Sequence, residues 1–186
     1  MIACLIKNEH EMAESLSLDR IDLRLLSLLQ QDGRATNADI AAQVNLSASA
    51  CLRRIQRLES SGVIQGYAAL VDPKRVGLGL QAFVRVQLEK HGQQGLDRFI
   101  EGVDSWDEVV ACHALTGDMD YLLQVVVQDL EHFSRFLLDK LINATGVADV
   151  NSSFVLRTVK QTRALPLALL RAGHCPCECC PATCAC

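Results

Sequence analysis

The chain has 186 residues, of which 49% are hydrophobic and 22% are charged, with only four prolines. This composition is typical of a globular protein and excludes collagen-like, proline-rich and broadly disordered chains. No apolar run approaches the roughly 18 residues that a membrane-spanning helix needs. The first 16 residues turn acidic after a short apolar start, unlike a signal peptide. We therefore expect a cytoplasmic protein with no membrane partner.

The charge is distributed unevenly along the chain, although the net charge is −4. Residues 17–75 carry eight basic and six acidic side chains, whereas residues 76–163 carry eight basic and twelve acidic ones. A mildly basic first half joined to an acidic second half indicates two parts with different roles. The net charge therefore does not exclude nucleic-acid binding by the first half.

Three helices are predicted in the basic half. The first begins after Asp19, a good N-cap, and carries an apolar stripe at helical spacing. The second begins after Thr36, and the third, over residues 48–60, begins after Ser47. Asn45, between these two helices, tolerates the left-handed conformation that ends a helix. Two helices joined by so short a turn predict a helix-turn-helix.

The third predicted helix carries the residues that point to DNA. It contains Arg53, Arg54 and Arg57, and no acidic residue before Glu59. Its first turn holds only small residues, so this end is able to approach base edges. DNA binding is one interpretation of this pattern. An amphipathic three-helix core with a solvated arginine face is the other.

Beyond the helices the pattern changes to strands. Residues 63–71 alternate with period two and predict a short strand pair or a wing-like strand, and residues 72–79, with one Pro and two Gly, predict a linker. The rest of the chain predicts the order βαββαβ of a ferredoxin-like fold. The expected elements are a strand at 82–88, a helix at 96–103, strands at 109–116 and 121–127, a helix after Asp129, and a strand at 147–156 whose continuation over 158–165 is left open. Such a sheet leaves one face uncovered, which predicts a dimer.

No catalytic constellation is recognisable in the sequence. The five histidines are scattered without metal-ligand spacing, and no phosphate-binding glycine motif is present. The best ligand candidate is the loop TGDMD at residues 116–120. Two carboxylates beside a glycine suit an ammonium group, and exposed backbone amides suit a carboxylate, so this loop fits a zwitterionic amino acid. A plain hairpin turn is the alternative interpretation.

Six of the nine cysteines crowd into the last dozen residues, within HCPCECCPATCAC. Six thiolates at such spacings are able to bind Zn²⁺ or Cu(I). We favour an unstructured extension with fortuitous cysteines, so we expect no metal site and no cofactor.

Two segments resemble the DNA-binding domain of the Lrp/AsnC (leucine-responsive) family of bacterial and archaeal transcription regulators. They are LDRIDLRLLSLLQQDGR and TNADIAAQVNLSASACLRRIQRLESSGVIQGYAALVDPKRVG. Two later segments resemble the family's ligand-sensing domain, and they are CHALTGDMDYLLQVVV and GVADVNSSFVLRTVKQ. The resemblance runs from about Leu18 to Leu167, in one order and without a large gap.

The resemblance implies an α+β protein with an N-terminal winged helix-turn-helix domain and a ferredoxin-like βαββαβ effector-binding domain. We expect an N-terminal extension at 1–16, a DNA-binding domain at 17–71, a linker at 72–79, a ligand-sensing and oligomerisation domain at 80–167, and a Cys-rich, disordered tail at 168–186. The resemblance also implies homodimers that assemble into a higher oligomer such as an octamer. It implies a nucleoid-associated protein in the cytoplasm of a bacterium or archaeon, and no enzymatic activity.

The expected site residues fall into two groups. The expected contacts to double-stranded DNA are Thr36, Asn37, Ser47, Ser49, Arg53, Arg54 and Arg57. The resemblance implies an amino-acid effector bound between effector domains, and the positions that match its pocket are Leu115, Thr116, Gly117, Asp118, Asp120, Tyr121, Ser153, Phe154 and Val155.

Two other functions stay open at this point. Tetrapyrrole (sirohaem) decarboxylases resemble the same two-domain family, but such an enzyme has no need of an arginine-bearing recognition helix. A thiol- or metal-responsive regulator would use the Cys-rich tail as its sensor.

Overall fold

The computed structural model describes residues 17–89 and 93–170. These residues divide into two compact units, and each is described by itself. The first unit contains residues 17–69 and the segment 161–170, and the second contains the remaining described residues between 70 and 160. None of the described helices is long and apolar enough to cross a membrane.

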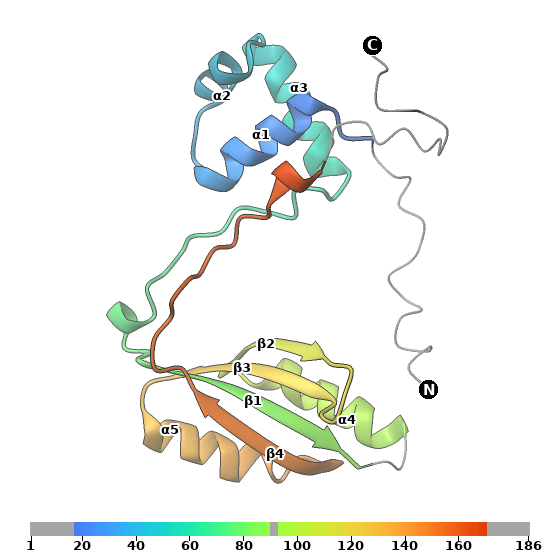
Figure 1. The fold of residues 1–186 in the computed structure, drawn as a ribbon, viewed down its shortest axis with the longest axis vertical. Helices are drawn as coiled ribbons and strands as arrows, with labels where there is room; N and C mark the ends of the chain where they lie inside the picture. The colour runs from blue at the N-terminus through green and yellow to red at the C-terminus, as the bar shows by residue number, and fades with distance from the viewer. Residues whose placement is uncertain (1–16, 90–92, 171–186) are drawn as a thin grey trace. The chain divides into compact units, whose positions relative to one another are not determined.

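The first unit is built from three helices, shown in blue to cyan in Figure 1. They are α1 (Arg20–Gln31), α2 (Asn37–Val44) and α3 (Ala48–Ser60). The predicted caps are confirmed, because Asp19, Thr36 and Ser47 each accept a hydrogen bond from the backbone N–H three residues later. Asn45 ends α2 in the left-handed conformation, with φ of 55°. The helix-turn-helix prediction is therefore confirmed, and α3 has the bounds predicted for the third helix.

Apolar side chains from the three helices meet in one core. Its buried members are Leu25, Ile40, Ala41, Val44, Cys51 and Ile55. The structure buries Cys51 of α3 completely, while the neighbouring Leu52 stays 40% exposed. Burial raises the pKa of the Cys51 thiol, so this cysteine is a core residue rather than a reactive one.

The predicted strand at 63–71 is not formed. After α3 the chain makes a turn held by the Ile64 N–H, which donates to the Leu58 carbonyl oxygen at 3.0 Å. Residues 65–71 then continue without any strand pairing. A strand needs a neighbour whose backbone groups complete the ladder, and no described segment of this unit offers one. In the predicted linker the chain forms a short 3-10 turn, η2 (Lys74–Val76).

The second unit confirms the predicted βαββαβ order. Its elements are β1 (Leu80–Leu88), α4 (Gln93–Ser105), β2 (Val109–Ala114), β3 (Tyr121–Val127), α5 (Leu130–Arg135) with its π-helical continuation η3 (Phe136–Leu141), and β4 (Val147–Phe154). The strands form one antiparallel sheet in the order β2-β3-β1-β4. Beyond β4 the open continuation over 158–165 is not a strand.

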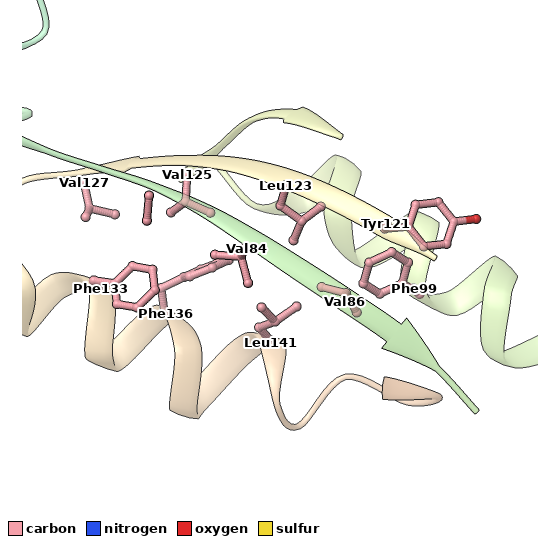
Figure 2. Close-up of a cluster of buried hydrophobic side chains, with 11 residues drawn as sticks. Val84, Val86, Phe99, Tyr121, Leu123, Val125, Val127, Phe133, Phe136 and Leu141 are labelled. Carbon is pink, nitrogen blue, oxygen red and sulfur yellow. The ribbon is translucent and has the colours of Figure 1, made fainter. Parts of the chain in front are cut away.

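One face of the sheet packs on the helices and the other is open. Alternate side chains of β1 and β3, such as Val84 and Leu123, are fully buried and meet Phe99 of α4 and Phe136 of η3 (Figure 2). On the opposite face, Phe83 is 38% exposed although it is a large apolar residue. The alternation expected for a half-covered sheet is therefore present.

The chain after β4 returns to the first unit. Gln161 to Leu170 group with the three helices in the single chain, and the domain boundaries expected from the sequence stay a prediction. A short 3-10 turn, η4 (Leu167–Leu169), closes this segment. The sequence did not reveal this grouping, because the residues that meet are 135 positions apart.

Candidate functional site

The outer face of α3 is polar and open. The helix buries one apolar stripe in the core, and helical spacing places Ser49, Arg53 and Gln56 together on the opposite, exposed side. Arg53 forms no ion pair with any described residue. Gln56 was not among the predicted contacts, although its position three residues after Arg53 is the sequence signal that identifies it.

The first turn of α3 is free of bulky and acidic side chains. Ser47 caps the helix by accepting a hydrogen bond from the Ala50 N–H at 3.2 Å, and its hydroxyl lies 3.2 Å from that of Ser49. Both serines are exposed. The positive end of the helix dipole and two hydroxyl groups therefore lie at one accessible place.

Arg54 and Arg57 are engaged by acidic residues of α1. The Arg54 guanidinium donates to Asp19 at 2.7 Å and to Asp22 at 2.8 Å, and Arg57 donates to Asp22 at 2.6 Å. The carboxyl of Asp22 is completely buried. The absence of acids on α3 before Glu59 therefore did not reveal these ion pairs, because the partners lie on another helix.

The same network perturbs Asp19. Partial burial raises the pKa of this carboxyl, but the hydrogen bond from the Asp22 N–H and the Arg54 guanidinium outweigh that effect, and the pKa of Asp19 is lowered. Asp19 and Asp22 also form a reciprocal capping box at the start of α1. The ion pairs thus join the start of α1 to the middle of α3.

The start of α2 presents backbone donors. Thr36 caps this helix, accepting from the Asp39 N–H at 3.2 Å and donating its hydroxyl to the Asp39 carboxylate at 2.6 Å. The amide groups of Asn37 and Ala38 have no acceptor within the described chain, as expected in the first turn of a helix. Such groups are suited to a phosphate oxygen.

The predicted ligand loop joins β2 to β3 and is held at its second half. The Asp120 N–H donates to the Val86 carbonyl oxygen at 2.9 Å, and the Asp120 carboxylate accepts from the Leu88 N–H at 2.7 Å. Gln87 donates to the Asp118 carbonyl oxygen at 3.1 Å. One oxygen of Asp120 is therefore committed to the end of β1, whereas the side chain of Asp118 has no hydrogen-bond partner among the described residues.

The first half of the loop leaves backbone donors unused. Within the described chain, the amides of residues 116–119 donate to no acceptor. Gly117 has a φ of +123°, a conformation that side chains disfavour, and no atom lies within 4 Å of where its Cβ would be. The loop therefore combines exposed amides with a carboxylate, the two groups that a free amino acid requires.

The two halves of the predicted effector site lie at opposite ends of the sheet. Val86 of β1 pairs with Tyr121, next to the loop, whereas Ala82 pairs with Phe154. Four residues along a strand span roughly 13 Å. The Val155 N–H donates to the Gln81 carbonyl oxygen at 2.9 Å, which fixes this second half at the start of β1. One copy of the chain therefore does not bring the predicted effector residues together.

Two predicted effector residues also belong to the packing of the second unit. Tyr121 is only 8% exposed, and its ring lies 5.1 Å from that of Phe99 (Figure 2). Phe154 packs edge-on against Phe133, with ring centroids 4.9 Å apart. Leu115, Thr116 and the other loop residues before Met119 are exposed, as is Ser153. These exposed residues are available to a ligand, and so are the exposed Asp120 and the partly exposed ring of Phe154.

The predicted tail lies largely outside the described residues, and so does the N-terminal extension. Among the residues that the structure does describe, no group of three or more His, Cys, Asp or Glu side chains is arranged to hold a metal ion. The two described cysteines, Cys51 and Cys112, are free.

The chain was compared with protein families and with known relatives. A family described as the Lrp/AsnC ligand binding domain matches residues 81–165, and one described as winged helix-turn-helix DNA-binding matches residues 18–65. The Bkd operon transcriptional regulator of Pseudomonas aeruginosa is 43% identical over 150 residues, covering 81% of this chain and 98% of that protein. The leucine-responsive regulatory protein of Escherichia coli is 38% identical over 148 residues, covering 80% and 90%.

Solved structures show the same similarity. A transcriptional regulator from Neisseria meningitidis, solved as a complex with L-Met, has 47% sequence identity and a TM-score of 0.80, covering 83% of this chain and 99% of that one. An AsnC family regulator from Agrobacterium tumefaciens has 38% identity and a TM-score of 0.78, covering 83% and 100%.

The helix-turn-helix unit and the ferredoxin-like unit define a two-domain transcription regulator that binds DNA and carries a ligand-binding domain. The length and the sequence identity of the matches also identify the family. The chain belongs to the Lrp/AsnC family of transcription regulators.

Proposed function

We propose that this regulator reads operator DNA with the outer face of α3 and that a small amino acid changes its DNA affinity or its assembly. The observation that carries the proposal is the exposed group Ser49, Arg53 and Gln56, on the side of α3 away from the core. A helix face with one arginine that has no ion pair among the described residues, together with two uncharged polar side chains, fits the major groove.

The residues of the first unit divide into contacts and supports. Arg53 is the proposed contact to a guanine or a phosphate, and the hydroxyls of Ser47 and Ser49 support it at the start of the helix. The free amides at Asn37, beside the cap Thr36, contact the phosphate backbone. Arg54 and Arg57 instead position α3 on α1 through their acidic partners, and any DNA contact they make is secondary.

The effector pocket is proposed to lie between two copies of the chain. The loop Leu115–Asp120 of one copy meets Ser153–Val155 of another, since the register of β1 keeps the two halves apart within one copy. The open face of the sheet, where large apolar residues such as Phe83 are exposed, gives the copies a surface to pair on. Tyr121 and Phe154 form the walls of the pocket rather than its polar contacts.

The chemistry of the loop suits an L-amino acid. Its ammonium group would bind the Asp118 carboxylate and the uncommitted oxygen of Asp120, and its carboxylate would bind the free amides of residues 116–118. A relative in this family was solved with L-Met, which supports an amino acid as the ligand class. Such a site needs no metal and no organic cofactor.

The remaining parts of the proposal concern assembly and location. Homodimers place two α3 helices in successive major grooves, about 34 Å apart, and association into a larger ring such as an octamer raises the effective concentration of each half-site contact. The regulator acts on DNA in the cytoplasm and catalyses no reaction. Its relatives are transcriptional regulators, which supports this assignment.

The DNA-binding part is tested by fluorescence anisotropy with the DNA upstream of the chain's own coding region and with a scrambled control. Arg53→Ala should weaken binding to the upstream DNA by about tenfold and reduce its salt dependence. Arg98→Ala removes an equal charge from the exposed side of α4 in the other unit and should leave binding unchanged. Equal affinities for Arg53→Ala and the wild type would refute the proposed role of α3.

A further inference from the structure

The segment after β4 is attached to α1 by its backbone. The Leu165 N–H donates to the side-chain oxygen of Gln30 at 2.5 Å, and the Gln30 side-chain NH₂ donates back to the Leu165 carbonyl oxygen at 3.4 Å. One side-chain amide thus binds both polar groups of a single residue, as a neighbouring strand would. The contact is specific to backbone position, because the Leu165 side chain itself is 68% exposed.

The same segment covers one side of α1. Arg20, Leu23, Arg24 and Ser27 of the helix line a shallow groove of about 390 Å³ together with Leu167, Ala168 and Leu170. These α1 residues recur at intervals of three and four with Gln30, so they lie on one helical face. The apolar stripe of α1 that packs on α2 and α3 includes Leu25 and lies on the other side. The segment therefore touches the DNA-binding unit without covering α3.

This attachment links the two proposed sites through the chain. Ser153 and Phe154 end β4 and Val155 follows them, and only residues 156–160 separate these residues from the segment that joins the first unit. On α1, Gln30 holds that segment, while Asp22 of the same helix holds Arg54 and Arg57 of α3. A rigid helix with a polar contact on each side is a physical route for coupling.

We propose that residues 161–170 form a second tether, in addition to the linker at 72–79, by which effector binding acts on α1 and through it on the recognition helix α3. The inference rests on the proposed function, since it needs an effector that engages the end of β4. The segment is mostly exposed and is held by few hydrogen bonds, so it belongs to the weakly held elements that open and close readily.

The test compares three variants of the full chain. Gln30→Ala removes both hydrogen bonds to Leu165. Gln31→Ala truncates the next residue of α1, an exposed glutamine whose side chain makes no hydrogen bond within the described chain, and serves as the matched control. Leu165→Ala keeps the backbone groups and should behave as the wild type.

Two readouts are made on each protein. Hydrogen exchange of the amides in residues 161–170, followed by mass spectrometry, should rise about fivefold in Gln30→Ala and stay unchanged in the controls. The expected size is that of one hydrogen bond, the one at 2.5 Å, because the second bond, at 3.4 Å, is too long to add much. The factor by which a pool of the twenty L-amino acids changes the DNA dissociation constant is measured as well. This factor should become smaller, by up to about fivefold, in Gln30→Ala only.

The outcomes separate the tether from the proposed function. Equal exchange in Gln30→Ala and the wild type overturns the docking, and faster exchange with an unchanged ratio overturns the tether as a route of coupling. A wild-type chain whose DNA affinity ignores the pool overturns the proposed amino-acid response and the coupling with it, while protection of residues 161–170 then reports docking alone.

Discussion

Asp22 is the residue whose replacement should disturb the DNA-binding unit most. Its fully buried carboxylate accepts from Arg54 at 2.8 Å, from Arg57 at 2.6 Å and from the Asp19 N–H at 3.1 Å. Removing one partner of a buried ion pair costs about 3–5 kcal/mol. Here the two arginine side chains keep 29% and 46% of their exposure, and asparagine retains one acceptor oxygen. We therefore expect Asp22→Asn to lower the local free energy of unfolding by about 2 kcal/mol.

Hydrogen exchange of the α1 and α3 amides in the full chain measures this loss. A change of about 2 kcal/mol corresponds to roughly thirtyfold faster exchange. The matched control is Asp32→Asn, because Asp32 is exposed and its side-chain oxygen accepts from the Arg34 N–H at 2.9 Å, a bond that asparagine preserves. If Asp22→Asn accelerates exchange no more than this control, the ion pairs do not hold α3 on α1 and the reasoning is refuted.

Further predictions concern a salt bridge, the ligand loop and a helix turn. Burial raises the pKa of Glu108, but hydrogen bonds from Lys140 at 2.8 and 2.9 Å and the charge of that lysine outweigh it, and the pKa is lowered. The ionised carboxylate therefore stabilises the fold at pH values above the ordinary glutamate pKa of about 4.3. This contribution is lost as the pH falls through the lowered pKa. Between pH 7 and pH 3, the melting temperature should fall more steeply in the wild type than in Glu108→Gln. Asp120→Asn keeps an acceptor for the Leu88 N–H, so circular dichroism should find it folded, while anisotropy should find its DNA binding less responsive to the amino-acid pool; an undiminished response would remove Asp120 from the effector site. Asn45→Ala forces a side chain that disfavours a φ of 55° into that conformation and should cost about 1 kcal/mol, whereas Asn45→Gly should not; equal hydrogen exchange of α3 in both would contradict this.

The elements of the first unit were predictable because their signals are local. Asp19, Thr36 and Ser47 each cap the helix that follows, and the short turn at Asn45 needs only a residue that tolerates positive φ. The wing-like strand at 63–71 failed for the opposite reason. Its period-two pattern records which residues alternate, but a strand also needs a partner, and the pattern does not say whether one is present.

The arrangement of the sites depended on contacts that spacing does not record. Arg54 looked free because no acid lies near it on α3, yet its partner Asp22 is 32 residues earlier. The ligand loop and Ser153 were assigned to one pocket by resemblance, and only the register of β1 shows that a single chain separates them. The attachment of Leu165 to α1 rests on a backbone group, which carries no sequence signature.

The most direct test of the central claim is a fluorescence-anisotropy titration of the purified, reduced full chain. The DNA upstream of its own coding region is titrated against a scrambled control at two salt concentrations, with and without a pool of the twenty L-amino acids. We expect saturable, salt-sensitive binding that prefers the upstream DNA and shifts by about fivefold or more when the pool is added. Binding that does not distinguish the two DNAs and does not respond to the pool would contradict an amino-acid-responsive regulator acting at this DNA.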